Sequence, residues 1–362
     1  MADFLKIENI ESDDGQLPVL SRFNLTMKKG EINVLLGEPG SGKDTLLRLI
    51  AGLGKIKKGK IVLMGNHIST AEYMMPMNQR DCSYIPKKNL LFPHLTVAKN
   101  IQLSLRGVSR KKRKYIVQNV LAKVGLAGFD GYLANSLNRG QELRVAVARA
   151  LALEPSLILI NNPFAYPVSA QQLDFISYLR SILVDHGITA LIAMEDPADA
   201  FAIADNIGIM HEGQLLQWDT PYTIYHHPQH RASVKVIGDG QLLEGHIQSA
   251  STMSCELGTL SFERKSDEIR TGLLVEFLIY PDDVVYDKKA AVKGVVIRKE
   301  FRGAMTNYTL QLNHNSKAQC LCPSHQDLSP GSPFPFRVSM DHLIIFKAGE
   351  NTAIDLGKAC TK

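Results

Sequence analysis

Residues 37–43 have the types and spacing that hold a phosphate group. The segment reads Gly-Glu-Pro-Gly-Ser-Gly-Lys, follows the short apolar run Glu31–Leu36 and precedes the helix-like stretch Asp44–Leu53. The glycines let successive backbone N–H groups point at phosphate oxygens, the helix N-terminus adds its dipole, and the lysine adds a positive charge. The sequence therefore predicts a nucleotide-binding loop made of Gly37, Glu38, Pro39, Gly40, Ser41, Gly42, Lys43, Asp44 and Thr45.

Asp44 departs from the usual form of such a loop. The pattern has Ser or Thr at this position, where the hydroxyl binds Mg²⁺. A carboxylate adds negative charge beside a polyphosphate. Asp44 is the one residue that we identify as a possible magnesium ligand.

The segments around this loop predict alternating strands and helices. Leu157–Ile160 and Ile188–Met194 are short apolar runs, typical of strands that are buried on both faces of a parallel sheet. Apolar residues recur at helical spacing within 117–124 and 175–183. We therefore expect residues 1–236 to form an α/β domain with a largely parallel sheet.

The pattern changes near residues 237–240. Beyond them apolar residues alternate with polar ones, as in 275–279, 308–312 and 334–338, and Pro and Gly punctuate the strands. Short strands at this spacing are typical of a small barrel or sandwich. Residues 237–362 are therefore predicted to form an all-β domain.

Composition sets the outer limits. The chain has 362 residues, a formal net charge of +5 and 45% hydrophobic residues, which favours two globular domains and excludes disordered or fibrous classes. The excess of base is too mild to indicate a nucleic-acid partner. The five scattered cysteines favour a reducing compartment over a disulfide framework. We find no signal peptide and no apolar run long enough to span a bilayer, so we expect a soluble chain that meets a membrane through a partner.

Further motifs occur in an order that resembles the ATP-binding subunits of ABC importers over essentially the whole chain. They are Leu91–Val97 (LFPHLTV), Leu137–Gln141 (LNRGQ), Arg144–Leu151 (RVAVARAL), Leu157–Pro163 (LILINNP), Ala204–Met210 (ADNIGIM) with Gly213, and Thr220–Tyr225 (TPYTIY). The resemblance implies a P-loop nucleotide-binding domain of the ABC ATPase type with a helical subdomain, ATP with Mg²⁺ as cofactors, and transmembrane permease subunits as partners.

The C-terminal part narrows the likeness. The segments concerned are Ile237–Gly240 with Leu242 and Leu243, Pro281–Val284, Phe301–Ala304, Pro323–His325 and Asp341–His342. They resemble the OB-like accessory (TOBE-type) domain of ferric-iron importers. Polyamine, sulfate and thiamine importers share this layout, so the resemblance implies an importer more firmly than it implies iron.

The residues at the family's chemical positions differ from the family pattern. The adenine-stacking aromatic aligns with Asp14, the glutamine that senses γ-phosphate and Mg²⁺ with Lys87, and the switch histidine with Glu195. The signature Ser-Gly-Gly-Gln becomes Asn138, Arg139, Gly140 and Gln141. The metal-shell aspartate becomes Asn161, the glutamate that polarises water becomes Asn162, and the following D-loop reads Ala-Tyr-Pro-Val at 165–168.

These differences predict weak or no ATP binding and loss of hydrolysis. Hydrolysis needs an in-line water held by a base, and a metal that neutralises charge developing on the γ-phosphate. Asn162 cannot accept a proton as a carboxylate does, and Asn161 is a weak neutral partner for Mg²⁺. The apolar framework is meanwhile intact.

Three functions follow. The first is a non-hydrolysing structural subunit at the cytoplasmic face of the inner membrane. It would dock on a permease near Lys87–His94, pair with a competent ATP-binding chain, and serve a periplasmic solute-binding protein indirectly. The second is an unorthodox ATPase that drives import as a homodimer. The third is a regulatory subunit that senses nucleotide.

Three other features have plain interpretations. The basic run Arg110–Lys114 is read as the solvated start of a helix, not as a lipid or nucleic-acid site. His226, His227 and His230 are read as a polar connector, with metal binding as the alternative. Arg139 is left open between clamping a phosphate and blocking the site.

The substitutions also suggest compensation. Asp44 gains a negative charge where Asn161 loses one, and Lys87 and Glu195 bring opposite charges to two positions that flank the γ-phosphate in the family. We hypothesise that Asp44 hydrogen-bonds Asn161 and that Lys87 pairs with Glu195. The alternative is neutral drift, with each side chain pointing to water.

Overall fold

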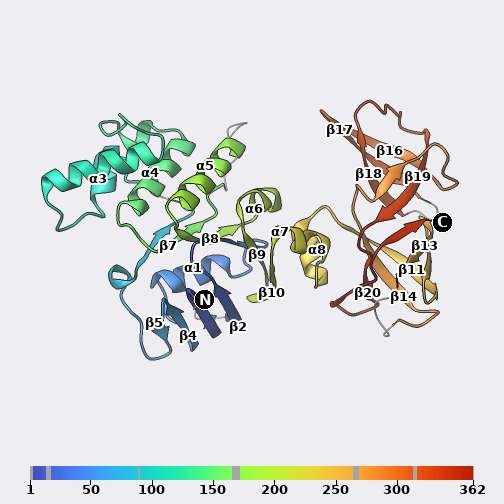
Figure 1. The fold of residues 1–362 in the computed structure, drawn as a ribbon, viewed down its shortest axis with the longest axis horizontal. Coiled ribbons are helices and arrows are strands. Elements are labelled where there is room, and N and C mark those ends of the chain that lie inside the picture. Colours follow the sequence, from blue (N-terminus) through green and yellow to red (C-terminus); the bar gives the residue numbers. More distant parts are fainter. Residues whose placement is uncertain are drawn as a thin grey trace. The chain divides into compact units, whose positions relative to one another are not determined.

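The structure, a computed structural model, describes residues 3–13, 18–88, 90–164, 172–263, 269–312 and 316–361 (Figure 1). The chain divides into two compact units, Met1–Pro221 and Tyr222–Lys362. The division precedes the expected boundary at 236/237 because helix α8 (Arg231–Ile237) packs with the C-terminal strands. Its Val234 is buried in a cluster with Leu278 and Phe346.

The first unit is built on a six-stranded sheet with the order β10-β9-β3-β8-β7-β6. Five of its strands run parallel, and β10 pairs antiparallel with β9. Every residue of β3, β7 and β8 is buried, as predicted from the apolar runs. The strands are β3 (Ile32–Leu36), β6 (Cys82–Ile85), β7 (Leu157–Asn161), β8 (Thr189–Met194), β9 (Asn206–His211) and β10 (Gln214–Asp219).

A smaller antiparallel sheet of the same unit has the order β2-β1-β4-β5. Its apolar face shares one buried cluster with helix α1 (Lys43–Ala51), which follows β3 directly. The phosphate loop thus lies between two elements whose apolar residues are buried. The strands are β1 (Leu5–Asp13), β2 (Pro18–Met27), β4 (Lys58–Leu63) and β5 (Asn66–Thr70).

Helices complete the first unit, and α3 and α4 lie side by side in Figure 1. Arg110–Lys114 opens α3 with mostly exposed side chains, so the solvated-helix interpretation is confirmed. Among the residues described, no helix is both long and apolar enough to cross a membrane. The helices are α2 (Val97–Gln102), α3 (Arg110–Lys123), α4 (Arg139–Leu151), α5 (Gln172–Asp185) and α6 (Pro197–Ile203), with short 3₁₀ turns η1 (Met77–Gln79) and η2 (Ala134–Ser136).

The second unit begins with α7 (Pro221–His226) and α8 and continues as strands whose pairings are all antiparallel in the described residues. The predicted all-β domain is confirmed. The strands are β11 (Gln241–Ser249), β12 (Thr252–Cys255), β13 (Gly258–Phe262), β14 (Leu274–Ile279), β15 (Val284–Tyr286), β16 (Lys293–Arg302), β17 (Met305–Gln311), β18 (Lys317–Pro323), β19 (Pro333–Met340), β20 (Ile344–Lys347), β21 (Ala353–Asp355) and β22 (Ala359–Thr361).

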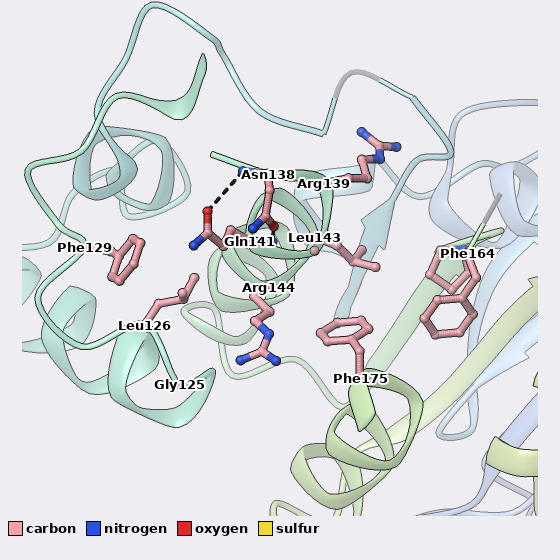
Figure 2. A pocket seen from close by; sticks show the side chains of 12 residues that line it. Gly125, Leu126, Phe129, Asn138, Arg139, Gln141, Leu143, Arg144, Phe164 and Phe175 are labelled. Atoms are coloured by element: carbon pink, nitrogen blue, oxygen red, sulfur yellow. Dashed lines mark hydrogen bonds between the residues drawn. The ribbon is translucent and has the colours of Figure 1, made fainter. Parts of the chain in front are cut away.

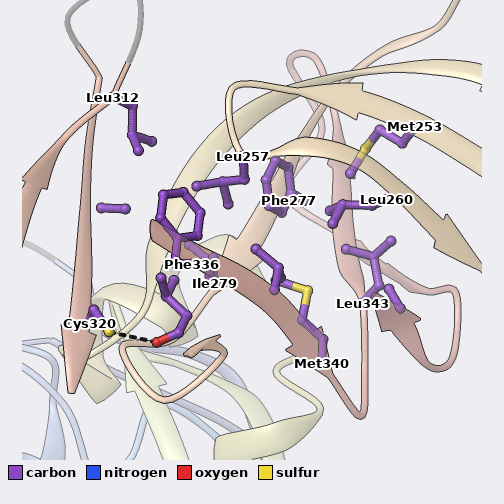
Figure 3. Close-up of a cluster of buried hydrophobic side chains, with 14 of the residues drawn as sticks. Met253, Leu257, Leu260, Phe277, Ile279, Leu312, Cys320, Phe336, Met340 and Leu343 are labelled. Atoms are coloured by element: carbon purple, nitrogen blue, oxygen red, sulfur yellow. Dashed lines mark hydrogen bonds between the residues drawn. The ribbon is translucent and has the colours of Figure 1, made fainter. Parts of the chain in front are cut away.

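The strands of the second unit enclose an apolar core of their own. Phe277, Phe336 and Leu257 are fully buried and point toward one another in Figure 3. All five cysteines are free thiols, as expected from their scattered positions, and Cys320 and Cys322 are buried in β18. The Cys320 thiol donates to the Val284 carbonyl at 2.7 Å.

Candidate functional site: the phosphate loop and its neighbours

The phosphate loop connects β3 to α1 in a backbone conformation that requires glycine at three of its positions. Gly40 and Gly42 have φ angles of 85° and 98°, in the left-handed region. A Cβ on Gly42 would lie 3.0 Å from the Val19 carbonyl oxygen, and one on Gly37 would lie 2.3 Å from the Met210 carbonyl oxygen. The backbone is thus shaped as the sequence predicts, with α1 starting at Lys43.

The Lys43 ammonium is buried in its own loop. Its Nζ donates to the carbonyl oxygens of Gly37 and Glu38 at 2.7 and 2.8 Å, and to the Ser41 hydroxyl at 2.9 Å. Burial lowers the pKa of Lys43 to about 8, while the Glu195 carboxylate acts in the opposite direction. All three donor positions are occupied, so a phosphate group would have to displace protein oxygens to reach this ammonium.

The predicted contact between Asp44 and Asn161 is confirmed. The Asn161 side-chain nitrogen donates to Asp44 Oδ1 at 2.5 Å, from the last residue of β7 to the first turn of α1. The Tyr84 hydroxyl, from β6, donates to the same oxygen at 3.2 Å. Sequence reasoning missed Tyr84, because nothing in the sequence reveals that β6 pairs with β7 beside α1.

The predicted pair of Lys87 and Glu195 is also present. Lys87 Nζ lies 2.8 Å from Glu195 Oε1, and each side chain is 36% exposed. Arg139 joins the same group of residues: it donates to the Lys87 carbonyl oxygen at 3.1 Å and forms an ion pair with Glu142 at 2.9 Å. Residues aligned with three separate family motifs are therefore tied to one another, and drift with side chains pointing to water does not describe this geometry.

Asn162 occupies the position of the water-polarising glutamate. It is 7% exposed and has a φ angle of 44°, a left-handed conformation that asparagine tolerates. Its backbone N–H donates to the Ala193 carbonyl at 2.8 Å, whereas its buried side-chain nitrogen has no hydrogen-bond partner among the residues described. The side chain at this position therefore offers an amide and no ionisable oxygen.

The signature residues begin helix α4. The Asn138 side chain accepts from the Gln141 N–H at 2.9 Å, and the Gln141 side chain accepts from the Asn138 N–H at 3.0 Å, a reciprocal capping box. Figure 2 shows this pair, with Arg139 pointing away from it, beside a pocket of about 360 Å³. Asn138 thus keeps the capping role that a serine performs equally well.

Two predicted site features lie outside the described residues. They are Asp14, aligned with the adenine-stacking aromatic, and the D-loop at 165–168.

The residues present fit a phosphate group better than they fit a metal shell. The glycine backbone and the N-terminus of α1 form a cradle for an anion. The candidate magnesium ligand, Asp44, instead has one carboxylate oxygen that already accepts two hydrogen bonds. Asn161 directs its amide nitrogen, which cannot bind a cation, toward that carboxylate.

Comparisons with known protein families match segments in both units of the chain. The ABC transporter family profile matches residues 20–165, which include the phosphate loop, the signature helix and β7, and the TOBE domain profile matches residues 277–346. A domain of the first kind implies ATP binding, usually with Mg²⁺. The solved structure of cbiO1 from Clostridium perfringens, part of the ABC transporter complex cbiONQ, has the same fold, with a TM-score of 0.56 and 24% identity over 63% of this chain and 92% of that one.

Curated relatives match nearly the full chain. The Fe(3+) ions import ATP-binding protein FbpC 2 of Haemophilus influenzae is 30% identical over 85% of this chain and 88% of its own length. The spermidine/putrescine import ATP-binding protein PotA of Clostridioides difficile is 30% identical over 87% of this chain and 90% of its own. The chain therefore belongs to the family of ATP-binding subunits of ABC importers, with a TOBE domain in its C-terminal unit.

Proposed function

We propose that this chain is a hydrolysis-deficient subunit of an ABC importer, which pairs with a second, competent ATP-binding chain. The observation that carries the proposal is the internal closure of the site. Lys87 bonds Glu195, Asn161 bonds Asp44, and Lys43 bonds carbonyl oxygens of its own loop. Each of these groups has a protein partner at a position where family members act on nucleotide.

Chemistry supports the loss of turnover. An in-line water must be oriented and relieved of a proton as it attacks, and an amide at 162 supplies no base. Glu195 and Asp44 add negative charge to a site where charge develops on the γ-phosphate, which disfavours the transition state. Removal of one such catalytic contribution typically slows an enzyme by a factor of about 10²–10⁴, and here several are missing together.

Partners and solute follow from the family. We place the chain on the cytoplasmic face of the inner membrane, bound to permease subunits. The surface around Phe92, which is 49% exposed, and the exposed His94 is the proposed docking site. The Phe92 backbone is held by Asn100, whose amide accepts at 2.8 Å and donates at 3.1 Å. Ferric iron is the favoured solute because several close relatives carry that name, and spermidine or putrescine is the alternative.

Turnover by the purified chain tests the proposal. We expect phosphate release from Mg-ATP at background, unchanged by Lys43→Ala. Asn162→Glu alone should not restore it, because Asn161 and Glu195 remain. Release at a rate usual for importer ATPases, abolished by Lys43→Ala, would instead establish the unorthodox homodimeric ATPase. Tight ATP binding without turnover or permease association would establish the nucleotide sensor.

Docking is tested by co-purification with the permease and an intact ATP-binding chain. Phe92→Ala should weaken capture of the permease, because an exposed aromatic side chain is lost from the proposed interface. The matched control is Tyr73→Ala, which removes an aromatic side chain that is 48% exposed on the smaller sheet's side. Equal capture of both variants and the wild type would contradict this docking surface.

A further inference from the structure

Two histidines and one aspartate converge at the start of the C-terminal unit. His227 Nδ1 lies 3.2 Å from Asp355 Oδ2, and His342 Nδ1 lies 3.8 Å from the same oxygen. The two imidazole rings are 3.9 Å apart between centroids. One potential ligand atom from each residue falls within 4.8 Å of the others. These three residues form one cluster although His227 and His342 are 115 positions apart in the sequence, and His342 and Asp355 are 13 positions apart.

Backbone hydrogen bonds position the connector between α7 and α8 (residues 227–230), which carries His227. Arg231 N–H donates to the Asn351 carbonyl at 2.9 Å, and Ala353 N–H donates to the Gln229 carbonyl at 3.1 Å. These contacts hold the connector against the turn between β20 and β21, and Asp355 is the last residue of β21. His227 and Asp355 therefore meet because the backbone brings them together.

Hydrogen bonds also position Asp355 and His342. The Gly357 N–H donates to Asp355 Oδ1 at 2.7 Å, which orients the carboxylate and leaves Oδ2 toward the histidines. The Leu356 N–H donates to the Leu343 carbonyl and the Leu343 N–H donates to the Gly357 carbonyl, each at 2.8 Å, and these bonds hold the backbone next to His342 beside Asp355. His230, the third histidine of the connector, caps α8 through its Nδ1 and takes no part in this cluster.

His342 supplies an observation of a different kind. Its Nδ1 is buried and has no hydrogen-bond partner within the described part of the chain. A buried imidazole nitrogen that faces a carboxylate oxygen from just beyond hydrogen-bond range has the position of a potential metal ligand.

We propose that His227, His342 and Asp355 bind a divalent transition-metal ion of the zinc class. Zinc takes imidazole nitrogen at about 2.0–2.1 Å and carboxylate oxygen at about 2.0–2.2 Å, so that its ligand atoms stand roughly 3.3 Å apart. The separations of 3.2 and 3.8 Å from Asp355 Oδ2 are close to that value. Two nitrogens and one oxygen suit Zn²⁺, Co²⁺ or Fe²⁺, whereas Mg²⁺ and Ca²⁺ prefer oxygen alone.

Such a site would be open on one side. The three side chains are 31%, 24% and 29% exposed in the order His227, His342 and Asp355, so solvent reaches the cluster and water can complete the coordination. The ion would join the connector before α8 to the β20–β21 hairpin. Its effect on this unit is therefore a gain in stability that grows with free metal.

Metal titration of the full chain tests the site. After chelation, Zn²⁺ titrated calorimetrically should bind with a stoichiometry of one per chain, and Co²⁺ should give a visible absorption spectrum. His342→Ala and Asp355→Asn should weaken binding roughly tenfold or more. The matched control is His246→Ala, which removes an exposed histidine of β11 and should leave binding unchanged.

A second measurement works on the unaltered protein. Zn²⁺ should protect His227 and His342 from acylation by diethyl pyrocarbonate, read by peptide mass spectrometry, while His246 remains reactive. Circular dichroism checks that each variant is folded. The proposal is overturned if the wild type takes up no zinc, which would leave an ion pair only, or if zinc binds equally to the His342→Ala variant and protects neither histidine.

Discussion

The phosphate-loop site and the C-terminal unit treat their polar groups in opposite ways. Around the loop, substituted residues have found one another: Lys87 pairs with Glu195, and Asn161 with Asp44. In the C-terminal unit, burial raises the pKa of the Asp283 carboxyl, and the buried His342 Nδ1 has no hydrogen-bond partner in the described part of the chain. The charged groups of the first region are paired with one another, although the buried Asn162 amide nitrogen has no partner among the described residues, whereas the second region keeps a buried imidazole nitrogen, His342 Nδ1, without a hydrogen bond.

The difference between the two regions reflects different constraints on their polar groups. A site that no longer turns over nucleotide still has to accommodate its charged side chains, and reciprocal pairing is a low-energy solution. Unpaired buried groups are instead destabilising, so they persist where a ligand or a structural need compensates for them. Substitutions in each region measure how well its polar groups are satisfied.

The largest effect on stability is expected at Lys43, a buried charged group of the first region. Its folded-state pKa of about 8 lies below the ordinary value of 10.5, so the unfolded chain binds more protons between these two pH values. Stability therefore rises with pH in this window. The stability of the wild type relative to Lys43→Met should increase by roughly 2–3 kcal/mol from pH 8 to pH 10.5, measured by urea unfolding.

The control for this measurement is Lys29→Met, which removes an exposed ammonium at the turn before β3. Its stability should stay parallel to that of the wild type across the same range. Parallel curves for Lys43→Met would show that the loop carbonyls compensate fully for burial of the ammonium.

Asp283 provides the next effect, in the second region. Burial raises its pKa from 3.8 to about 7, although Oδ2 accepts the Tyr280 N–H at 2.8 Å. A raised pKa means that this residue's contribution is fully present below pH 4 and is lost as the pH rises through 7. Asp283→Asn keeps an acceptor oxygen and should stabilise the chain by about 2 kcal/mol at pH 8 but little at pH 4.

Thermal unfolding at the two pH values measures this difference. The neighbouring Asp282→Asn is the matched control, because Asp282 is exposed and its substitution should shift the unfolding temperature little at either pH. An equal shift in both variants would attribute the effect to net charge rather than to burial of Asp283.

The Lys87–Glu195 pair should show a smaller coupling. Both side chains are partly exposed, so solvent screens the interaction, and a double-mutant cycle with alanine should give about 1 kcal/mol. The reference is the Lys58–Glu11 pair, at a similar separation of 2.9 Å but with a lysine that is 70% exposed, and its coupling should be smaller. If Lys87 and Glu195 show no coupling energy, the substitutions are better explained by neutral drift than by compensation.

The fold was largely predictable from the sequence, because strands such as 157–160 and 188–194 are apolar throughout and a two-sided burial is the one arrangement that suits them. Two side-chain contacts were predicted from the charges of the substituted residues. Lys87 and Glu195 carry opposite charges, and Asp44 gains the negative charge that Asn161 loses. Tyr84 and the cluster of His227 with Asp355 were not predictable, because strand order and hairpin placement bring them together and neither leaves a local pattern. The structure divides before α8 and not after it, because Val234 packs in a cluster with Leu278 and Phe346, and no local sequence pattern indicates this contact.

The smallest change in stability is expected for Asp44→Ser, which restores the family hydroxyl. It removes the oxygen that accepts from Asn161 and Tyr84, and because Asp44 is exposed the loss should be about 0.5 kcal/mol in urea unfolding. It also removes a negative charge from the first turn of α1, where a phosphate would bind. ATP affinity should therefore rise severalfold, measured by calorimetry in Mg²⁺, while phosphate release stays at background because Asn162 still offers no base. Asp44→Asn removes the charge but keeps the acceptor, so it separates the two effects: affinity should rise and stability should hold. If neither variant binds ATP more tightly, the charge of Asp44 is not what closes the site, and the internal contacts of Lys87 and Lys43 remain as the cause.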